Sequence, residues 1–530
     1  MSVTGKQLIG GQWHTGNGGS YMATNPANAE PIGPELRFAS KKQIQEATLA
    51  ASLAAPAFAA TSPDERGRFL VACADEIVAL GDELLERVSA ETGYPRVRAE
   101  GERGRTCGQL RMFADHIVRG DYFDVRIDTA LPERQPMPRP DLRFCKHPLG
   151  PVLVFGSSNF PLAFSAAGGD TASALAAGCP VIVKSHNAHP GSGELVAQAL
   201  VRAAEKSNMP AGVISFLTGE GNDIGAELVT APEIKAIGFT GSYRGGSALF
   251  KMANNRPVPI PFFGEMGSIN PLIVLPETLK ASAAVLANGY IGSLTLGTGQ
   301  FCVNPGLVLG IDGPELNEFI EAIGAALADQ PAGVMLTESI AEAYNRGADS
   351  LAGQPGVKRI SAGADRNSSP GFCGQARLYS VTAADFVENP ALQEEVFGPC
   401  SLVVKCRGID ELAQAVSSLH GQLTGTLHGT DAELSNAKEL VRMFEQRVGR
   451  VVFNGFPTGV EVSDAMMHGG PFPASTDSRF TSVGTAAIDR FIRPVCYQNS
   501  PQNLLPLALR DDNPWRLRRL VNGEWSNDAI

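Results

Sequence analysis

The sequence lacks the cysteine patterns that would indicate a disulfide framework or a metal centre. Its nine cysteines are scattered, with no CxxC pair and no Cys/His spacing suited to zinc. We therefore expect a fold that needs no disulfides and a protein that holds no metal. An odd number of irregularly spaced cysteines fits a reducing cytoplasm, where a reactive thiol would also stay reduced.

Three further absences exclude other classes of protein. No apolar run reaches the roughly 18–20 residues of a membrane span. The first residues show no basic stretch followed by an apolar core, as a secretory signal would. The net charge of −11 offers no basic excess for nucleic acid. The remaining expectation is a cytoplasmic enzyme with neither a nucleic-acid partner nor a membrane partner.

The pattern of apolar residues predicts an α/β protein, and a length of 530 residues predicts two or three domains. Residues 40–118 place apolar side chains three and four apart, as helices do. From residue 151, β-branched runs alternate with Ala-rich segments, which is typical of a parallel sheet. These runs are 152–155, 180–183, 213–217 and 236–240. Since ligands of such sheets bind beyond the carboxyl ends of the strands, the following loops outline a nucleotide crevice.

Cys302 is a candidate nucleophile because it lies among glycines and small polar residues in segment 296–306. A free cysteine is usually a small buried hydrophobe, so the interpretation depends on companion motifs. Three accompany it: a turn that holds Asn159, an acidic Glu265 between glycines, and a Glu-Glu-Val-Phe-Gly-Pro segment at 394–399. In this order the four motifs resemble those of the aldehyde dehydrogenase superfamily.

The resemblance implies a Rossmann-type parallel-sheet cofactor domain, an α/β catalytic domain and a small oligomerisation arm. The expected boundaries are 1–122 and 146–262 for the NAD(P)-binding domain, 263–472 for the catalytic domain, and 123–145 with 473–530 for the arm and the C-terminal tail. The arm of this family joins subunits, so a homodimer or homotetramer is implied.

The resemblance also implies a mechanism for oxidising a small-molecule aldehyde. Cys302 would attack the carbonyl as a thiolate, and the side chain of Asn159 would stabilise the oxyanion together with the Cys302 backbone N–H. Glu265 would activate the water that hydrolyses the thioester, with a pKa raised by its apolar surroundings. Relatives that transfer the acyl group to coenzyme A generally do without this base, so Glu265 favours a carboxylic acid as product.

The cofactor implied by the resemblance is NADP or NAD. Lys184 is the lysine that family members direct to the adenosine ribose. Three residues later, NAD-preferring relatives commonly carry a glutamate where this chain has Asn187, which removes a charge repulsion and favours NADP. Glu220 and Asp223 in the next loop count against a 2′-phosphate. The full set of expected cofactor residues is Phe155, Gly156, Ser157, Lys184, Asn187, Gly221, Gly225, Thr240, Gly241, Ser242, Glu395 and Phe397.

Within the superfamily, segments 299–306, 467–477 and 480–488 are most similar to the branch that oxidises α-ketoglutaric semialdehyde (2,5-dioxovalerate). Another semialdehyde or a fatty aldehyde is the alternative substrate. A carboxylate on the substrate calls for an arginine or a cluster of polar groups at the tunnel mouth. The expected substrate residues are Phe160, Phe301, His468 and Arg479, with Arg111 and Arg493 as further candidates for the carboxylate.

Two readings from other classes remain. A catalytically silent homologue, acting as a structural or binding protein, would be expected to have lost Cys302, Glu265 or Asn159, and all three are present. A cysteine hydrolase would need a histidine beside the thiol, and no motif places one there.

Overall fold

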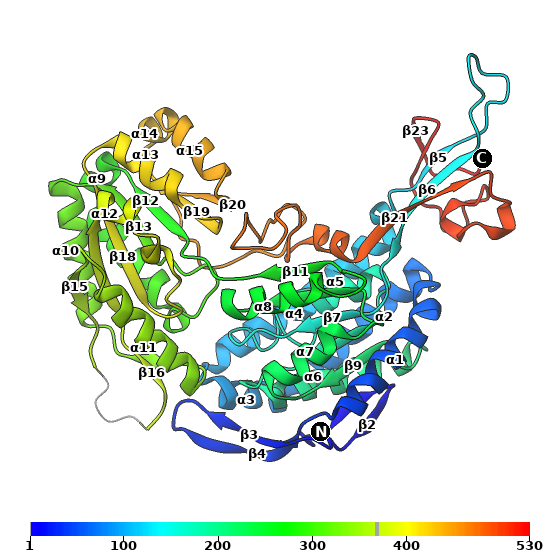
Figure 1. Ribbon diagram of the computed structural model, residues 1–530, viewed down its shortest axis with the longest axis horizontal. Helices are drawn as coiled ribbons and strands as arrows, with labels where there is room; N and C mark the ends of the chain where they lie inside the picture. Colours follow the sequence, from blue (N-terminus) through cyan, green and yellow to red (C-terminus); the bar gives the residue numbers. More distant parts are fainter. Residues whose placement is uncertain (1, 366–369) are drawn as a thin grey trace.

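The computed structural model describes residues 2–365 and 370–530 and confirms the α/β fold (Figure 1). Two seven-stranded sheets form the centres of two lobes, and a five-stranded sheet forms an arm that projects from the first lobe. A two-stranded ribbon, β3 (Ser20–Asn25) with β4 (Glu30–Arg37), lies along the bottom of the first lobe. Within the described ranges, no helix is long and apolar enough to cross a membrane.

The first sheet has the strand order β11-β10-β7-β8-β9-β1-β2. Its bounds are β11 (Phe262–Glu265), β10 (Ala236–Thr240), β7 (Val152–Phe155), β8 (Val181–Lys184), β9 (Ile214–Leu217), β1 (Gln7–Ile9) and β2 (Gln12–His14). The five strands from β11 to β9 are parallel. The four predicted strands are therefore confirmed to within one residue, and their carboxyl ends share one edge of the sheet.

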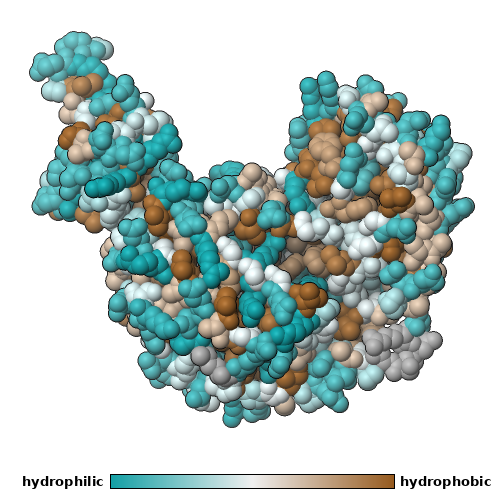
Figure 2. Space-filling model, turned by 180° about the vertical axis from the view of Figure 1, so that it is seen from behind, coloured by the Kyte–Doolittle hydropathy of each residue, from teal (hydrophilic) through white to brown (hydrophobic). Residues whose placement is uncertain are grey.

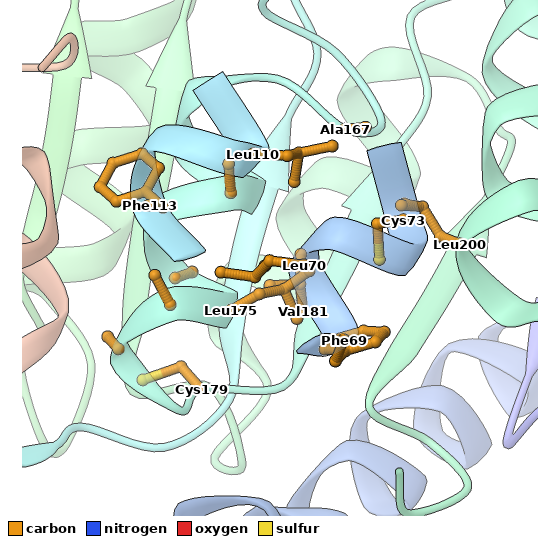
Figure 3. Close-up of a cluster of buried hydrophobic side chains, with 14 of the residues drawn as sticks. Phe69, Leu70, Cys73, Leu110, Phe113, Ala167, Leu175, Cys179, Val181 and Leu200 are labelled. Atoms are coloured by element: carbon orange, nitrogen blue, oxygen red, sulfur yellow. The ribbon is translucent and has the colours of Figure 1, made fainter. Parts of the chain in front are cut away.

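Helices cover both faces of this sheet, as Figure 1 shows. They are α1 (Lys41–Ala59), α2 (Pro63–Val78), α3 (Gly81–Thr92), α4 (Arg96–Arg119), α5 (Gly169–Ala177), α6 (Pro190–Lys206), α7 (Gly221–Thr230) and α8 (Tyr243–Asn254). Figure 3 shows the core where α2 and α4 meet the sheet: Leu70 lies beside Val181 of β8, and Phe69 and Phe113 belong to the same fully buried cluster. This packing fixes α4, whose opposite side approaches the candidate site.

One local expectation needs correction. The glycines of segment 218–225 predict a loop before a helix that begins near residue 226, but α7 already begins at Gly221. Gly225 therefore lies inside the helix, where a Cβ would come within 3.5 Å of the Phe155 ring. Gly225 is therefore a helix position that faces Phe155 of the sheet and not a turn residue.

The second sheet has the order β15-β17-β18-β13-β12-β19-β20, with only β15 antiparallel to its neighbour. Its bounds are β15 (Lys358–Ala362), β17 (Arg377–Thr382), β18 (Cys400–Cys406), β13 (Leu307–Ile311), β12 (Pro271–Val274), β19 (Gln422–His428) and β20 (Val448–Phe453). Its helices are α9 (Pro276–Thr295), α10 (Pro314–Ala328), α11 (Glu338–Ala352), α12 (Ala383–Glu388), α13 (Ile409–Ser418), α14 (Asp431–Asn436) and α15 (Lys438–Glu445). The chain passes directly from β11 to β12, so the two lobes meet beside Glu265.

The arm consists of β21 (Ile492–Gln498), β6 (Leu142–Pro148), β5 (Arg126–Asp128), β22 (Arg519–Val521) and β23 (Glu524–Ser526), in that order. It combines segments that are more than 300 residues apart in the chain. The 3-10 helix η4 (Thr485–Phe491), which precedes β21, returns to the first lobe, where Arg490 pairs with Asp170 of α5 at 2.6 Å. Both side chains are buried.

This ion pair generates a stability prediction. Asp170→Ala leaves the guanidinium of Arg490 buried without its partner, and we expect a loss of about 3–5 kcal/mol. Thermal unfolding followed by circular dichroism measures it. The matched control is Asp489→Ala, which removes the partly exposed pair with Lys146 and should cost only about 0–1 kcal/mol. Equal shifts in melting temperature for the two variants would contradict the prediction.

Candidate active site

A thiol, an imidazole and a carboxylate meet between the lobes in a group that we call the thiol cluster: Cys302, His468 and Glu265. Nε2 of His468 lies 3.4 Å from Sγ of Cys302 and 3.0 Å from Oε1 of Glu265. The hydroxyl of Ser482 donates a hydrogen bond of 2.9 Å to Oε2 of Glu265. His468 is 1% exposed and Glu265 4%. The cluster is thus hydrogen-bonded, with its carboxylate and imidazole buried and its thiol partly accessible.

Backbone pairing fixes Glu265 at the end of β11. The strand extends the parallel sheet beside Thr240 of β10. Beyond it, the Met266 N–H donates to the Ala474 carbonyl at 2.8 Å, and the Thr476 N–H donates to the Gly264 carbonyl at 3.0 Å. Because these bonds join β11 to the segment that follows His468, they fix the position of the Glu265 carboxylate relative to the His468 imidazole.

The loop that carries Cys302 depends on a glycine and on one asparagine. Gly299 has a φ of +65°, and a Cβ there would lie 2.3 Å from the carbonyl carbon of Gly398, so only glycine fits. The side-chain amide of Asn270 donates to the carbonyls of Cys302 and Asn304, each at 2.9 Å. The sulfur is therefore presented from a rigid turn.

Asn159 lies beside this turn. Its side-chain amide donates a 3.0 Å hydrogen bond to the carbonyl of Gln300, two residues before the cysteine. Its own carbonyl accepts from the Tyr94 hydroxyl and from Arg98 Nη2, both at 3.1 Å. A primary amide has two N–H donors, so one remains for a ligand next to Cys302.

Burial determines the ionisation of the thiol. It raises the pKa of Cys302 well above its usual range, and the negative charges of Glu265 and Glu395 raise it further, while the charge of Arg105 opposes the rise. Burial, with the charge of Glu265, also raises the pKa of Glu395 to about 7. The thiol is therefore protonated in the ligand-free protein and needs a base in order to react.

The pKa of Glu265 departs from the expectation. Apolar surroundings predict a raised value, and burial does act in that direction. The charge and hydrogen bond of His468, with the hydrogen bonds of Ser482 and Cys302, outweigh it and hold the pKa of Glu265 below its usual value. Glu265 is thus an ionised carboxylate at neutral pH, and the acid with the raised pKa is Glu395.

His468 also differs from expectation. It was predicted at the mouth of a substrate tunnel, and no motif placed a histidine next to Cys302. The structure buries it between the thiol and Glu265. It lies 166 residues from the cysteine along the chain, so no local spacing could have indicated the contact.

The expected cofactor residues gather at the carboxyl edge of the first sheet. Phe155, Lys184 and Thr240 end the parallel strands β7, β8 and β10. The others lie just beyond them or in α7: Gly156, Ser157, Asn187, Gly221, Gly225, Gly241 and Ser242. The Ser242 hydroxyl caps α8 by accepting from the Gly245 N–H at 3.3 Å.

This edge has polar groups that suit a nucleotide. Lys184 is almost fully buried, which lowers its pKa to about 8, and its ammonium forms no hydrogen bond or ion pair with a described residue. The hydroxyl of Ser157 is also buried without a partner in the described part of the chain. Unused buried donors at the ends of parallel strands fit a phosphate- and ribose-bearing ligand.

Glu395 and Phe397 come from the second lobe. The Ser268 N–H donates to Oε1 of Glu395 at 3.3 Å, which holds this side chain against the segment after Glu265. Phe397 is half-buried two residues later. The two lobes thus contribute to one site.

Two of the expected substrate residues form an aromatic wall near the cysteine, and one does not join the site. Phe160 and Phe301 meet edge to face at 5.2 Å. Arg479 is exposed, and Asp477 accepts from its Nε at 2.8 Å, so the structure does not bring it to the thiol cluster.

Three further residues belong to the site that no sequence pattern predicts there. Ser482 falls in a segment that marked the branch, but nothing in the segment indicated its bond to Glu265. Arg105 of α4 and Arg450 of β20 act on the thiol through their charges. A basic residue at a helical or strand position carries no signal that distinguishes it from a solvated surface charge.

The origin of the high thiol pKa can be tested by alkylation. Glu265→Gln removes a negative charge that raises the pKa of Cys302, so the pH profile of iodoacetamide labelling should move to lower pH. Mass spectrometry of the labelled peptide identifies the site, with Cys302→Ser as the blank. An unchanged profile, or one displaced to higher pH, would show that the carboxylate does not control the thiol.

Comparison with known proteins identifies relatives over nearly the whole chain. Residues 13–491 match the model of the aldehyde dehydrogenase family. The chain is 52% identical over 525 residues to alpha-ketoglutaric semialdehyde dehydrogenase 2 of Azospirillum brasilense, covering 99% of this chain and 100% of that protein. It is 47% identical to alpha-ketoglutaric semialdehyde dehydrogenase of Acinetobacter baylyi, covering 98% of each.

Solved structures share the fold at lower identity. Betaine aldehyde dehydrogenase from Staphylococcus aureus in complex with NAD+ superposes with a TM-score of 0.80 at 20% identity, covering 94% of this chain and 96% of that one. An aldehyde dehydrogenase from Brucella melitensis biovar abortus superposes with a TM-score of 0.77 at 25% identity, covering 94% and 98%.

Proposed function

This chain belongs to the aldehyde dehydrogenase family, and from that premise we propose that it oxidises α-ketoglutaric semialdehyde (2,5-dioxovalerate) to 2-oxoglutarate with NADP or NAD. The observation that carries the chemistry is the thiol cluster, in which a protonated thiol touches an imidazole and lies near a carboxylate. The substrate follows from the two relatives of 47–52% identity.

The first step is addition of Cys302 to the aldehyde. The thiol proton has one acceptor in the cluster, the ionised carboxylate of Glu265, to which the thiol is hydrogen-bonded, so the thiolate forms only where it is used. The oxyanion of the adduct takes the free N–H of Asn159 and the backbone N–H of Cys302, and each such donor contributes roughly 10²–10³ to the rate.

The second step is oxidation and the third is hydrolysis. The nicotinamide cofactor, when bound, would supply the hydride acceptor for the oxidation. Lys184 and Glu395 would hold its riboses, and Phe397 would pack near its ring. Glu265, ionised and held by Ser482, then takes a proton from the water that attacks the thioester, and the carboxylic acid leaves the thiol.

Substitution separates these steps. Cys302→Ser should abolish cofactor reduction with α-ketoglutaric semialdehyde, because a hydroxyl cannot form the thioester at this site. Glu265→Gln should still give a burst of reduced cofactor, of about one equivalent per site, followed by slow turnover. Stopped-flow absorbance measures both. An active serine variant, or a glutamine variant with full steady-state turnover, would refute this assignment.

We favour NADP over NAD as the cofactor. Asn187 brings no negative charge to the ribose, and Lys184 lies three residues before it with no acidic partner among the described residues. Glu220 and Asp223 near the start of α7 are exposed, and solvated acids there cost a dianion little.

The cofactor preference is tested at Asn187. Asn187→Glu restores a carboxylate that repels a 2′-phosphate, so KM for NADP should rise by roughly tenfold or more while KM for NAD changes little or falls. Asn187→Gln is the matched control and should behave as the wild type. An unchanged ratio of kcat/KM values in the glutamate variant would contradict the preference.

We also propose a homodimer or homotetramer joined through the arm. Among the strands of the described residues, β21 pairs with β6 alone and its other edge is open, and Leu131 and Met137 are exposed at the tip. The surface between the arm and the opposite lobe is hollowed, and the arm itself is mainly hydrophilic (Figure 2). An open strand edge is a natural place for a second chain to pair.

A second candidate activity is hydrolysis of activated esters without a cofactor. Glu265 and Nε2 of His468 both lie beside the thiol, so a base for forming the thiolate is present without a cofactor. An ester would acylate Cys302 directly, and Glu265 would remove the acyl group as proposed above.

A further inference from the structure

An unused edge of the Arg105 guanidinium lies in the apolar wall near Cys302. Arg105 belongs to α4, and its Nη1 donates to the carbonyl of Val460. Its Nε and Nη2 are buried and have no acceptor among the described residues. Buried donors are nearly always satisfied, so this pair calls for a ligand.

Apolar contacts place this edge near the sulfur. The guanidinium lies 5.7 Å from the centre of the Phe164 ring. Val460, which Arg105 holds, packs against Phe164 on one side and on the other against the apolar cluster that contacts Cys302. The charge of Arg105 is close enough to lower the thiol's pKa.

The same edge binds carboxylates elsewhere in this chain. Arg126 and Arg143 each direct Nε and Nη2 to the two oxygens of one aspartate, at 2.8–3.1 Å. Arg479 uses the same edge on Asp477. This side-on fork matches the geometry of a carboxylate. Arg105 presents it without an acceptor.

The other arginine near the thiol has no such edge to offer. Arg450 donates Nη1 to the Gly459 carbonyl at 3.0 Å and Nη2 to the Pro457 carbonyl at 2.6 Å. These bonds use both terminal nitrogens, and only Nε is left without an acceptor among the described residues. Arg450 therefore holds the loop before Val460, while Arg105 stays available.

Within the described residues, no acid forms an ion pair with Arg105, although the charges of nearby acids act on it. Oε1 of Glu102 accepts the Leu162 and Ala163 N–H groups at 2.8 and 3.0 Å. Glu461 is exposed and accepts the N–H of Val462. Neither forms an ion pair with Arg105 among the described residues. An incoming carboxylate would displace no existing pair.

We propose that Arg105 is the specificity-determining residue that binds the substrate's carboxylate through Nε and Nη2 while Cys302 attacks the aldehyde carbon. This inference rests on the proposed function and names the substrate class of the same site: short aliphatic aldehydes that end in a carboxylate. An uncharged aldehyde would leave Nε and Nη2 of Arg105 buried and unpaired. A site built to hydrogen-bond a substrate group discriminates strongly against a substrate that lacks this group.

The kinetic test compares substrates of equal length with and without the charge. Wild type, Arg105→Gln and Arg105→Lys are assayed with glutaric semialdehyde and with pentanal. Arg105→Gln should raise KM for glutaric semialdehyde by roughly 10-fold to 100-fold and leave kcat/KM for pentanal within about threefold. Arg105→Lys keeps the charge but not the fork and should fall between them. Arg479→Gln is the matched control and should match the wild type with both substrates.

Three kinetic results would overturn the proposal. The first is an equal loss of kcat/KM for both substrates in Arg105→Gln, which would assign Arg105 to holding the Val460 loop. The others are an unchanged preference for glutaric semialdehyde in that variant, and a wild type with equal kcat/KM for the two substrates. In the last case pentanal oxidation would still support the dehydrogenase activity.

Protection of Cys302 by a ligand distinguishes failure of the proposed contact between Arg105 and a carboxylate from failure of the dehydrogenase activity. Pentanoate should slow iodoacetamide labelling of Cys302 in the wild type and not in Arg105→Gln, with pentanamide as the uncharged control. If no aldehyde is oxidised, Arg105-dependent protection by pentanoate still supports the carboxylate site. Protection that is absent, or that persists in Arg105→Gln, contradicts it.

Discussion

The ionised carboxylate of Glu265 shares a nearly dry site with the thiol of Cys302, and the other features of the site follow from that contact. Two groups that both favour an anion cannot both be charged there, because their repulsion is strong where water is excluded. The protein assigns the charge to Glu265, with His468 and Ser482 as its partners. The cysteine is left as a thiol, hydrogen-bonded to the carboxylate that can accept its proton. Reactivity is thus withheld until a substrate brings an electrophile.

The surrounding charges extend this arrangement. Glu395 reaches the site from the second lobe, and its pKa is raised to about 7 by burial and by Glu265. Arg105 and Arg450 approach from the substrate side and provide the positive charge that the acids lack. Arg450 donates to the carbonyls of the loop at 457–459, so it holds that loop in place. Arg105 keeps two donors for which we propose a ligand. With the role proposed for Arg105, the site would have an anion-binding end and an acid-rich end, which would suit a linear substrate with a carboxylate opposite its aldehyde.

The features that the sequence predicts are local ones, such as strands and motifs. The features that it does not predict depend on contacts between residues far apart in the chain. The four β-branched runs predicted β7 to β10 because strand patterns are set within a few residues. The start of α7 was misjudged because Gly221 and Gly225 are turn residues by propensity, yet both lie in the helix. Cys302, Glu265 and Asn159 could be nominated from their motifs. His468, Ser482 and Arg105 could not, since each reaches the site from a segment that has no short-range signal for it. The direction of the Glu265 pKa was wrong for the same reason, because its two stabilising partners were unknown.

The central claim is that Cys302 carries the acyl group and that Glu265 releases it. Intact-protein mass spectrometry of Glu265→Gln, quenched in acid after mixing with α-ketoglutaric semialdehyde and the oxidised cofactor, tests it most directly. The account predicts a protein heavier by one acyl group, with the addition mapped to the peptide of Cys302 and absent without cofactor. A fully unmodified protein during turnover, or an acyl group on another residue, would contradict it.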